Sequence, residues 1–286
     1  MKYAFMHTHE DEFALKRMCA VLGVSRSGYY EWLTRPRSAR AARDEVLLGQ
    51  IRRVHTSCHE AYGAKKTWIE LKARGVLCGK HRVARLRKNE GIEARRKRRF
   101  RMKARYQQTA PAPNLLAQRF DAGRRDRVWV GDTTVIQTRA GLLYVAVLLD
   151  LYARRVVGWA GSNSHDLKLA LGALGMALQQ RRPGAGLIHH SDQGSIYTAR
   201  LYREALQSHG LRASMSGKGA PHDNAVAESF FSTLKNELVH HCSFATRESA
   251  CKALSDYIEL FYNRRRRHQG LGYVSPVDFE AGSGVA

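Results

Sequence analysis

The chain has 286 residues, with 48 Lys and Arg against 25 Asp and Glu, and a formal net charge of +23. Hydrophobic residues make up 44% of the sequence, enough for a packed core, which argues against disorder throughout. The longest apolar run, Leu142–Leu149, has eight residues, whereas a membrane span needs about 20, so an integral membrane protein is not expected.

The start of the chain and the cysteine content indicate where the protein works. Met1–His7 lacks the apolar stretch of a secretory signal, and five scattered cysteines give no disulfide framework. These features predict a soluble protein of a reducing cytoplasm. The positive charge predicts a polyanionic partner.

The excess charge lies in the N-terminal part of the chain. Residues 1–120 hold 28 basic and 10 acidic side chains, whereas residues 121–286 hold 20 and 15. Between Lys80 and Arg105 there are 13 basic residues against Glu90 and Glu93. Since Lys and Arg neutralise phosphates, this stretch indicates a nucleic-acid contact, with a solvated surface or an extended linker as the alternative.

The first 40 residues predict one helix pair. Glu12–Val21 has apolar residues at helical spacing until Gly23 interrupts the pattern. Ser25 is a suitable cap for a second helix that continues to Pro36. This segment resembles a helix-turn-helix unit.

A larger and more basic unit follows. Amphipathic helices are expected at Asp44–His55, Tyr62–Arg74 and Lys80–Lys88, with Gly75 in the turn before the last. A basic helix after such a turn is typical of a recognition helix in a major groove, although a purely structural helical bundle has the same pattern. The residues expected to contact DNA are Lys80, Arg82, Arg85, Arg87, Arg95, Arg96, Lys97, Arg98 and Arg99.

A zinc site in this region is a weaker hypothesis. His55 and His59, followed by Cys78 and His81, have a spacing that resembles a His/Cys ligand set. However, these residues fall at a helix end and in a turn, where His and Cys also occur without a metal. Zinc is therefore not expected.

The periodicity changes after a polar segment that contains Pro111 and Pro113. Strands are expected at 128–138, 142–151, 154–159, 187–192 and 211–214, and helices at 166–181, 198–209, 224–241 and 246–265. The first three strands should form an antiparallel meander within a mixed α/β fold. We expect four parts: a helix-turn-helix-like segment (1–40), a basic helix-turn-helix DNA-binding domain (41–105), a linker (106–120), and an α/β core with C-terminal helices (121–286).

Three acids are candidates for chemistry in the α/β part. Asp132 and Asp192 lie among apolar strand residues, where an unpaired charge is costly, and Glu228 lies in the first turns of a helix. Carboxylate clusters suit Mg²⁺ or Mn²⁺, which can activate the attacking oxygen and stabilise the leaving one in phosphodiester chemistry. Taken alone, the pattern favours a cap or surface residue for each acid, and Asp150 and Asp166 illustrate that alternative, the second as a helix cap.

The spacing of these acids resembles a known family. There are 35 residues between Asp192 and Glu228, as in the D,D,35-E core of the retroviral integrase superfamily. Four ordered motifs are similar to those of bacterial insertion-sequence transposases encoded in a second reading frame, and the similarity covers nearly the whole chain. The motifs are Trp129–Thr134, His190–Tyr197, Ser216–Glu237 and Tyr262–Pro276.

The resemblance implies an RNase H-like core, a mixed five-stranded sheet whose first and fourth strands are neighbours. It implies that Asp132, Asp192 and Glu228 are catalytic and bind two Mg²⁺ ions, for which Mn²⁺ can substitute. The implied activity is 3′-end cleavage and strand transfer of an insertion sequence, without a covalent protein–DNA intermediate. Tyr197 is then a packing or DNA-contacting residue.

The resemblance also bears on partners and secondary sites. Lys235, seven residues after Glu228, is a candidate for contact with the terminal phosphate, and Lys218 and Asn224 are further candidates for DNA contact. The implied partners are double-stranded DNA at the element ends and target, further copies of the chain, and an upstream-reading-frame protein or fusion. The alternatives are a non-catalytic DNA-binding regulator and a nuclease acting on RNA–DNA hybrids.

Overall fold

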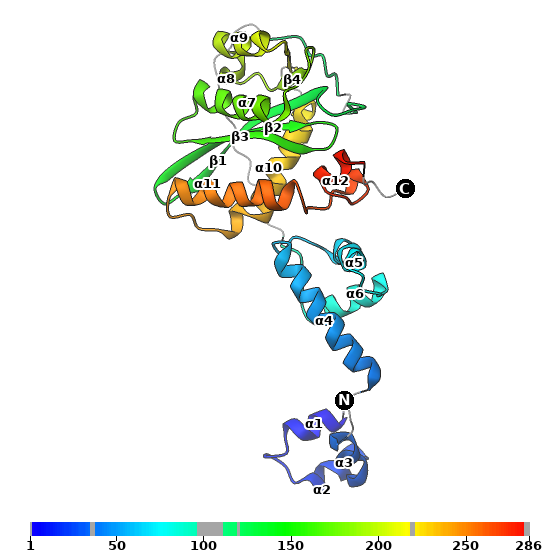
Figure 1. The fold of residues 1–286 in the computed structure, drawn as a ribbon. Coiled ribbons are helices and arrows are strands. Elements are labelled where there is room, and N and C mark those ends of the chain that lie inside the picture. The colour runs from blue at the N-terminus through cyan, green and yellow to red at the C-terminus, as the bar shows by residue number, and fades with distance from the viewer. Residues whose placement is uncertain (1, 35–37, 96–110, 119–120, 218–220, 283–286) are drawn as a thin grey trace. The chain divides into compact units, whose positions relative to one another are not determined.

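The computed structural model describes residues 2–34, 38–95, 111–118, 121–217 and 221–282. These residues divide into two compact units, Met1–Gln50 and Ile51–Ala286 (Figure 1). No helix in these ranges is long and apolar enough to cross a membrane.

The first unit is helical. It contains α1 (Lys2–Thr8), α2 (Leu15–Leu22), α3 (Arg26–Thr34) and the start of α4 (Ala39–Ser57). Gly23 ends α2 in the left-handed conformation that glycine adopts readily (φ 60°), and the Ser25 hydroxyl accepts a hydrogen bond from Gly28 N at the start of α3. The small core of this unit contains Met6, Met18, Cys19 and Tyr29. The expected helix pair is therefore present, and α1 is an additional helix.

The second unit begins with a helical module that we define as residues 51–95. It contains the end of α4, α5 (Ala64–Ala73) and α6 (Lys80–Asn89). Its buried side chains include Ile51, Tyr62 and Val83. The indole of Trp68 donates to Cys78 O (2.9 Å) and so closes the turn between α5 and α6.

A five-stranded sheet in the order β3-β2-β1-β4-β5 forms the centre of this unit. The strands are β1 (Val128–Thr138), β2 (Gly141–Asp150), β3 (Arg155–Ser162), β4 (Ile188–Ser191) and β5 (Arg212–Met215). The first three are antiparallel, whereas β4 is parallel to both β1 and β5. The expected meander and the expected adjacency of the first and fourth strands are both confirmed.

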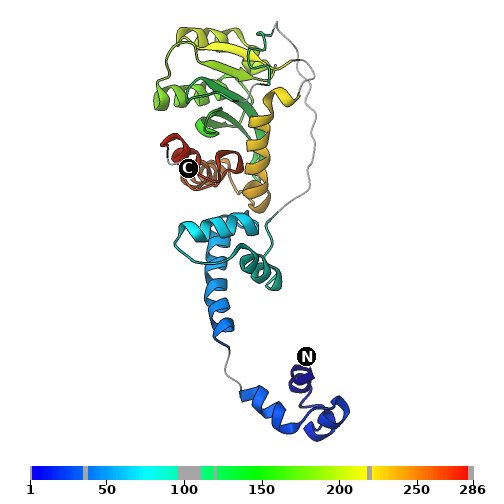
Figure 2. The ribbon, with the colours of Figure 1, turned by 90° about the vertical axis from the view of Figure 1, so that its right-hand side faces the viewer.

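Helices cover both faces of the sheet. On one face α7 (Leu167–Arg181) packs so closely that a Cβ on Gly158 of β3 would lie 2.2 Å from Ala173 O. On the other face lie α10 (Ala225–Glu237) and α11 (Arg247–Ser255), where a Cβ on Gly161 would meet Cys251 Sγ (Figures 1 and 2). Two shorter helices, α8 (Ser195–Thr198) and α9 (Arg200–Ser208), stand in place of the one expected at 198–209.

The C-terminal helices are more broken than the periodicity indicates. A 3-10 turn (Val239–His241) follows α10, and a π-helical segment (Asp256–Tyr262) continues α11. The chain then reaches α12 (Pro276–Glu280), which the sequence did not predict. Asp166 caps α7 by accepting from Leu169 N, as expected.

Asp150, by contrast, is neither a cap nor a surface residue, so that expectation is corrected. It is fully buried and accepts hydrogen bonds from Asp126 N, Tyr152 N and the Arg181 guanidinium. The same guanidinium also binds Glu280, so one cation ties α12 to the end of α7. This ion cluster stabilises the C-terminal end of the fold.

Candidate active site

Asp132 and Asp192 lie on neighbouring parallel strands. The pairing of β1 with β4 sets Val128 beside Ile188 and Val130 beside His190. The same register, continued for two residues, brings Asp132 level with Asp192 just beyond the end of β4. The two carboxylates that the sequence suggested are therefore neighbours across the sheet.

The pleat of β1 decides which helix Asp132 faces. Trp129 packs in the core cluster that includes Ala170 and Leu174 of α7. Since side chains alternate along a strand, Asp132 three positions later lies on the opposite face, the one that α10 contacts. This is the face on which Glu228 arrives.

The surroundings of Asp132 disfavour its negative charge. Its Oδ1 accepts a hydrogen bond from Thr133 N (2.7 Å), which favours the charged form. Desolvation by the surrounding protein outweighs this bond, and the negative charges of Asp192 and Glu228 add to it, so the pKa of Asp132 is raised to about 8. A cation placed among these acids would relieve that repulsion.

Asp192 is held by the turn that follows it. Its Oδ1 accepts from Gly194 N (2.9 Å), and a Cβ on Gly194 would lie 2.8 Å from the same oxygen. Desolvation raises the pKa of Asp192 as well. The Asp-x-Gly order of the sequence therefore serves to fix the carboxylate.

Glu228 and Asn224 stand one turn apart at the start of α10. Glu228 is exposed, whereas Asn224 is buried and donates from Nδ2 to Gly131 O (3.2 Å). The Oδ1 of Asn224 is buried and accepts no hydrogen bond from any residue that the structure describes. Asn224 therefore fastens α10 to the residue before Asp132, and its amide does not cap the helix.

Lys235 lies further along α10 and within electrostatic reach of Asp132. Burial lowers the pKa of Lys235, and the negative charge of Asp132 opposes that change. A half-buried ammonium beside a carboxylate site suits an anionic ligand such as a phosphate.

The three acids, as the structure places them, do not form a set of ligands around a single metal position. Across the described ranges, no group of three or more His, Cys, Asp or Glu side chains is arranged to hold a metal ion. The donor chemistry nevertheless fits Mg²⁺ or Mn²⁺, because the donors are carboxylate oxygens that repel one another. The buried amide oxygen of Asn224, which has no hydrogen-bond partner within the described ranges, adds a further hard donor near Asp132.

The expected recognition helix, α6, has one buried and one exposed side. Val83, Leu86 and Arg87 are buried, whereas Lys80, Arg85 and Lys88 are exposed. Arg82 lies between these extremes. The exposed side also carries His81 and Lys88, which are not among the expected DNA contacts. Their position opposite Val83 and Leu86 is the signal that would have identified them.

Arg87 requires a correction. It is 4% exposed, and its guanidinium donates to Thr67 Oγ1 (3.1 Å) and Tyr62 O (2.9 Å). An arginine used in this way joins α5 to α6 inside the module and does not reach a DNA phosphate. Its place at i+4 from Val83, on the apolar side of the helix, accounts for the difference.

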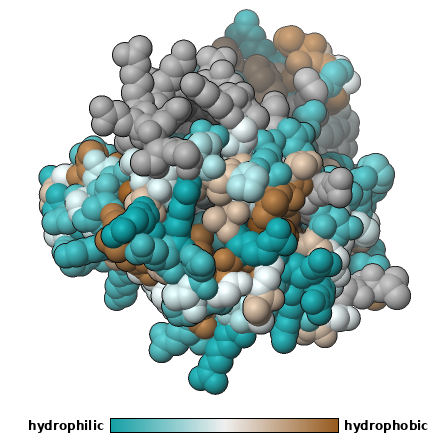
Figure 3. Space-filling model, turned by 90° about the horizontal axis from the view of Figure 1, so that it is seen from above, coloured by the Kyte–Doolittle hydropathy of each residue, from teal (hydrophilic) through white to brown (hydrophobic). Residues whose placement is uncertain are grey.

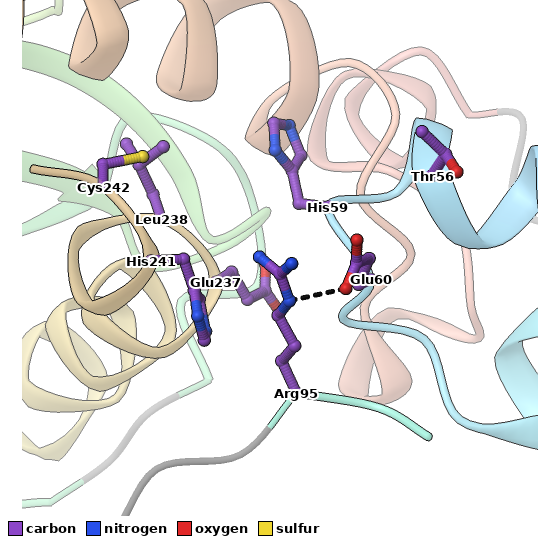
Figure 4. Close-up of a pocket in the computed structure, with 8 residues that line it drawn as sticks. All are labelled: Thr56, His59, Glu60, Arg95, Glu237, Leu238, His241 and Cys242. Atoms are coloured by element: carbon purple, nitrogen blue, oxygen red, sulfur yellow. Dashed lines mark ion pairs between the residues drawn. The ribbon is translucent and has the colours of Figure 1, made fainter. Parts of the chain in front are cut away.

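Arg95 is partly engaged within the protein. Its side chain forms an ion pair with Glu60, and both residues line a pocket of about 220 Å³ (Figure 4). The pocket is lined by Thr56, His59, Glu60, Arg95, Glu237, Leu238, His241 and Cys242. Both of its acids are paired, Glu60 with Arg95 and Glu237 with Arg266, so it does not resemble a catalytic centre. Arg96, Lys97, Arg98, Arg99 and Lys218 lie outside the described residues.

The residues of the weaker zinc hypothesis have separate surroundings. The ring of His59 packs against Phe261, with centroids 4.6 Å apart, and His55 Nε2 lies 3.8 Å from Glu60.

Tyr197 is buried beside His189 and Tyr202, which is the packing role considered for it.

Part of the Arg264–Arg267 run joins the helical module to the core. Arg267 binds Glu70 (2.7 Å), and its backbone N–H donates to Tyr62 Oη (2.9 Å). Arg266 forms a nearly buried ion pair with Glu237.

On the face that carries α8 and α9, hydrophilic side chains cover most of the coloured surface, and the apolar areas are small and separate (Figure 3).

Comparisons with known proteins agree with this arrangement. The Integrase core domain family matches residues 122–221 and 228–283, and the HTH-like domain family matches residues 42–100. The first two ranges contain Asp132, Asp192 and Glu228.

Individual proteins are similar over nearly the whole chain. The Insertion element IS600 uncharacterized 31 kDa protein of Shigella sonnei is 44% identical over 92% of this chain and 97% of its own. Transposase InsF for insertion sequence IS3A of Escherichia coli (strain K12) is 39% identical over 98% of each chain. Among solved structures, the HTLV-2 integrase catalytic core domain in complex with magnesium covers 55% of this chain and 97% of its own, with 14% identity and a TM-score of 0.41.

Proposed function

Because this chain belongs to the insertion-sequence transposases represented by InsF of IS3, with an integrase core and an HTH-like domain, we propose that it performs metal-dependent 3′-end cleavage and strand transfer. Members of this family are polynucleotidyl transferases. The observation that carries the finer proposal is the register of β1 and β4, which aligns Asp132 with Asp192 on the face reached by Glu228.

The three acids would together hold Mg²⁺, two ions in a complete site, with Mn²⁺ as a substitute. When bound, the ions would supply positive charge to the scissile phosphate and to the attacking and leaving oxygens. Asp132 and Asp192 would contribute from the sheet and Glu228 from α10, while Asn224 holds that helix against Gly131. Lys235 would bind and orient the phosphate beside Asp132.

The proposed chemistry proceeds by two displacements at phosphorus. Water attacks the phosphodiester at the element end; the 3′ oxygen leaves with a proton, so the products are a 3′-OH and a 5′-phosphate. That 3′-OH then attacks a target phosphodiester, forming one P–O bond as one breaks and releasing a target 3′-OH. Neither displacement requires a Ser or Tyr nucleophile, so the role of the protein is to position and neutralise charge.

The partner would be double-stranded DNA, at the element ends and at the target. Lys80, Arg85 and Lys88 on the exposed side of α6 favour phosphate and groove contacts, and Arg82 and Asn224 stay candidates for DNA contact. The basic run from Arg95 to Arg99 and Lys218 are proposed to add further contacts. We also propose that several copies assemble on DNA and that the upstream-reading-frame protein, separate or fused, takes part.

A strand-transfer assay tests the function. Synthetic duplexes with the two ends of the encoding DNA element would be incubated with the full chain and Mg²⁺, with and without the upstream protein. Asp132→Asn, Asp192→Asn and Glu228→Gln should each lose at least about 1,000-fold in cleavage and joining while still binding the ends. The matched control is Asp121→Asn, because Asp121 is exposed and accepts a hydrogen bond from Gly123 N.

The alternatives give different results in the same assay. A parental chain that binds ends but cleaves nothing with Mg²⁺ or Mn²⁺, in either the presence or absence of the upstream protein, would favour a DNA-binding regulator. Cleavage of RNA–DNA hybrids in preference to duplex ends would favour a hybrid nuclease. Parental rates in the three acid variants would contradict the site assignment.

A further inference from the structure

Asp223 is a buried carboxylate beside the site with no role so far. It is 4% exposed and directly precedes Asn224, the residue that fastens α10 to Gly131. Its Oδ2 accepts hydrogen bonds from Asn114 Nδ2 (2.8 Å) and Gly217 N (2.9 Å), and its Oδ1 accepts one from Gln118 Nε2 (2.9 Å). Such an arrangement compensates a buried charge without an arginine or lysine among these donors.

Two of these donors belong to a segment that we call the strap, residues 111–118. The strap lies along β5: Leu115 N donates to Ser214 Oγ (2.9 Å), and Pro113 O accepts from Met215 N (3.4 Å). The side chain of Leu116, within the strap, is buried. The strap is therefore bonded to the edge strand of the sheet and, through Asp223, to the beginning of α10.

The strap is also connected, through Ser214 of β5, to the buried histidine His190 of β4. Ser214 Oγ is 2.8 Å from His190 Nδ1, and His190 Nε2 is 3.3 Å from Ser216 Oγ. The charge of Asp223 acts on the same histidine and opposes the lowering of the pKa of His190 by burial. Asp192 follows His190 by two residues, so these contacts adjoin both the second and the third acid.

We propose that Asp223 is a positioning residue, which holds the first turn of α10 and thereby Glu228 in place by binding the strap and Gly217 with one carboxylate. The line of contacts runs from Asn114 and Gln118 to Asp223, then through the adjacent Asn224 to Gly131, next to Asp132. In its proposed role, Asp223 contacts neither the substrate nor a metal ion. The inference rests on the proposed function for its catalytic consequence, but not for its structural part.

The chemistry of the contacts suggests a sharp test. In Asp223→Asn one of the two oxygen positions becomes an NH₂ group, so the amide either keeps Asn114 and Gly217 and loses Gln118, or keeps Gln118 and loses the other two. The reciprocal pair Asp223→Asn/Asn114→Asp lets the new NH₂ donate to the new carboxylate while the amide oxygen accepts from Gln118, so both bonds to the strap are restored and only the bond from Gly217 N is lost. The carboxylate that Asn114→Asp introduces can still accept from Leu116 N and Ala117 N, as the amide oxygen of Asn114 does.

Hydrogen exchange of the full chain, without DNA, reports on the structural part. We expect Asp223→Asn to accelerate exchange of the amides of the strap and of Ala225–Glu228, and the reciprocal pair to restore protection of both while Gly217 still exchanges faster than in the parental chain. Asp121→Asn, which removes an exposed charge outside this network, should leave exchange at those amides unchanged. Faster exchange in the strap alone, with α10 unaffected, would overturn the proposal, as would a reciprocal pair that fails to restore protection.

Kinetics of 3′-end cleavage report on the consequence. Asp223→Asn should lower the turnover rate roughly 10- to 100-fold, because a displacement of about 1 Å at the reacting groups has effects of that size. The KM for element-end DNA should stay near the parental value, and the reciprocal pair should recover most of the rate. A parental rate in Asp223→Asn overturns the proposal.

Two further arms keep the test decisive. If Asp223→Asn does not fold, Asn114→Ala/Gln118→Ala keeps the carboxylate and its bond from Gly217 N but removes both side-chain bonds from the strap, with the same changes expected in the strap and in α10. If the parental chain cleaves no DNA, the proposed function fails, and the exchange data alone still decide whether Asp223 holds α10.

Discussion

The side-chain amide of Asn224 donates a hydrogen bond to the carbonyl oxygen of Gly131, 3.2 Å away. This bond joins the helix that carries Glu228 to the strand residue directly before Asp132, although 93 residues separate the two partners. The third acid is therefore placed by a specific contact to β1 as well as by packing of α10 on the sheet. Substitutions near this junction should disturb catalysis before they disturb the fold as a whole.

Gly131→Ala tests how closely β1 is packed beside Asp132. A Cβ at this position would lie 2.9 Å from Leu148 Cδ2 and 3.1 Å from His189 Nε2, so the strand or its neighbours must shift. We expect a loss of roughly 1–3 kcal/mol in the free energy of unfolding, measured with urea, and a larger relative loss of cleavage.

The matched control is Gly175→Ala in α7, where an added Cβ meets nothing within 4 Å. It should leave stability unchanged or raise it by up to about 1 kcal/mol, because alanine is the better helix former. Equal stability changes in the two variants would contradict the close packing at Gly131.

The ion cluster around Arg181 predicts a different kind of loss. Its guanidinium binds Asp126 (2.8 Å), Asp150 (3.1 Å) and Glu280 (2.8 Å), and Asp150 is fully buried. Arg181→Met would leave the buried Asp150 without its cation, whereas Glu280 would keep its ion pair with Arg155 (2.6 Å). Removing the cation of a buried pair typically costs about 3–5 kcal/mol in unfolding free energy. Urea denaturation should show this loss.

A surface ion pair provides the comparison. Arg200 lies 3.5 Å from Glu204 on α9, and both side chains are more than half exposed. Arg200→Met should therefore change stability by less than about 0.5 kcal/mol. A small effect of Arg181→Met, similar to that of Arg200→Met, would show that the cluster does not hold α12.

Much of the site could be predicted because its geometry follows from local patterns. The alternating residues around Asp132 and the short apolar run before Asp192 predict two strands, and the helical spacing after Asn224 predicts α10. The resemblance supplied the adjacency of the first and fourth strands, which the periodicity of a single strand cannot give. The register then brings the two aspartates level.

Other features depend on contacts between distant segments. Arg85 and Arg87 are both arginines, two positions apart on α6, so the sequence alone gives little reason to treat them differently. In the structure α5 covers Arg87 and leaves Arg85 exposed. The role of Asp150 depends on Arg181 and Glu280, which lie 31 and 130 residues further on, and no local pattern links them. Asp223 is a similar case, because its partners Asn114 and Gln118 lie in a segment that the sequence predicts to be a polar linker.

The two sides of α6 predict separable effects on DNA binding and folding. Lys80→Ala and Lys88→Ala should each weaken binding to element-end DNA and reduce the slope of log affinity against log salt by about one phosphate contact. Both variants should unfold at the parental urea concentration. Fluorescence anisotropy at several salt concentrations measures the slope.

Arg87→Ala is the counterpart inside the module. It removes hydrogen bonds to Thr67 Oγ1 and Tyr62 O and leaves these acceptors buried, so stability should fall by roughly 1–3 kcal/mol. DNA affinity per folded molecule and its salt slope should stay parental. A reduced salt slope in Arg87→Ala, with parental stability, would restore Arg87 as a DNA contact.

The last prediction concerns pH and His268, whose ring packs on Tyr262 with centroids 4.8 Å apart. Burial lowers the pKa of His268 to about 2, and the positive charges of Arg266, Lys66 and Arg154 add to that effect. Below about pH 6.5 the unfolded chain therefore takes up a proton here that the folded chain does not, so folding stability falls as the pH falls. Each such proton changes stability by up to about 1.4 kcal/mol per pH unit.

Urea denaturation between pH 7 and 5 should show a loss in the parental chain that exceeds the loss in His268→Gln by about 1–2 kcal/mol, because glutamine cannot take up the proton. His268→Asn should match His268→Gln in slope, whatever its stability at pH 7. Parallel curves for the parental chain and both variants would show that His268 does not resist protonation in the folded state.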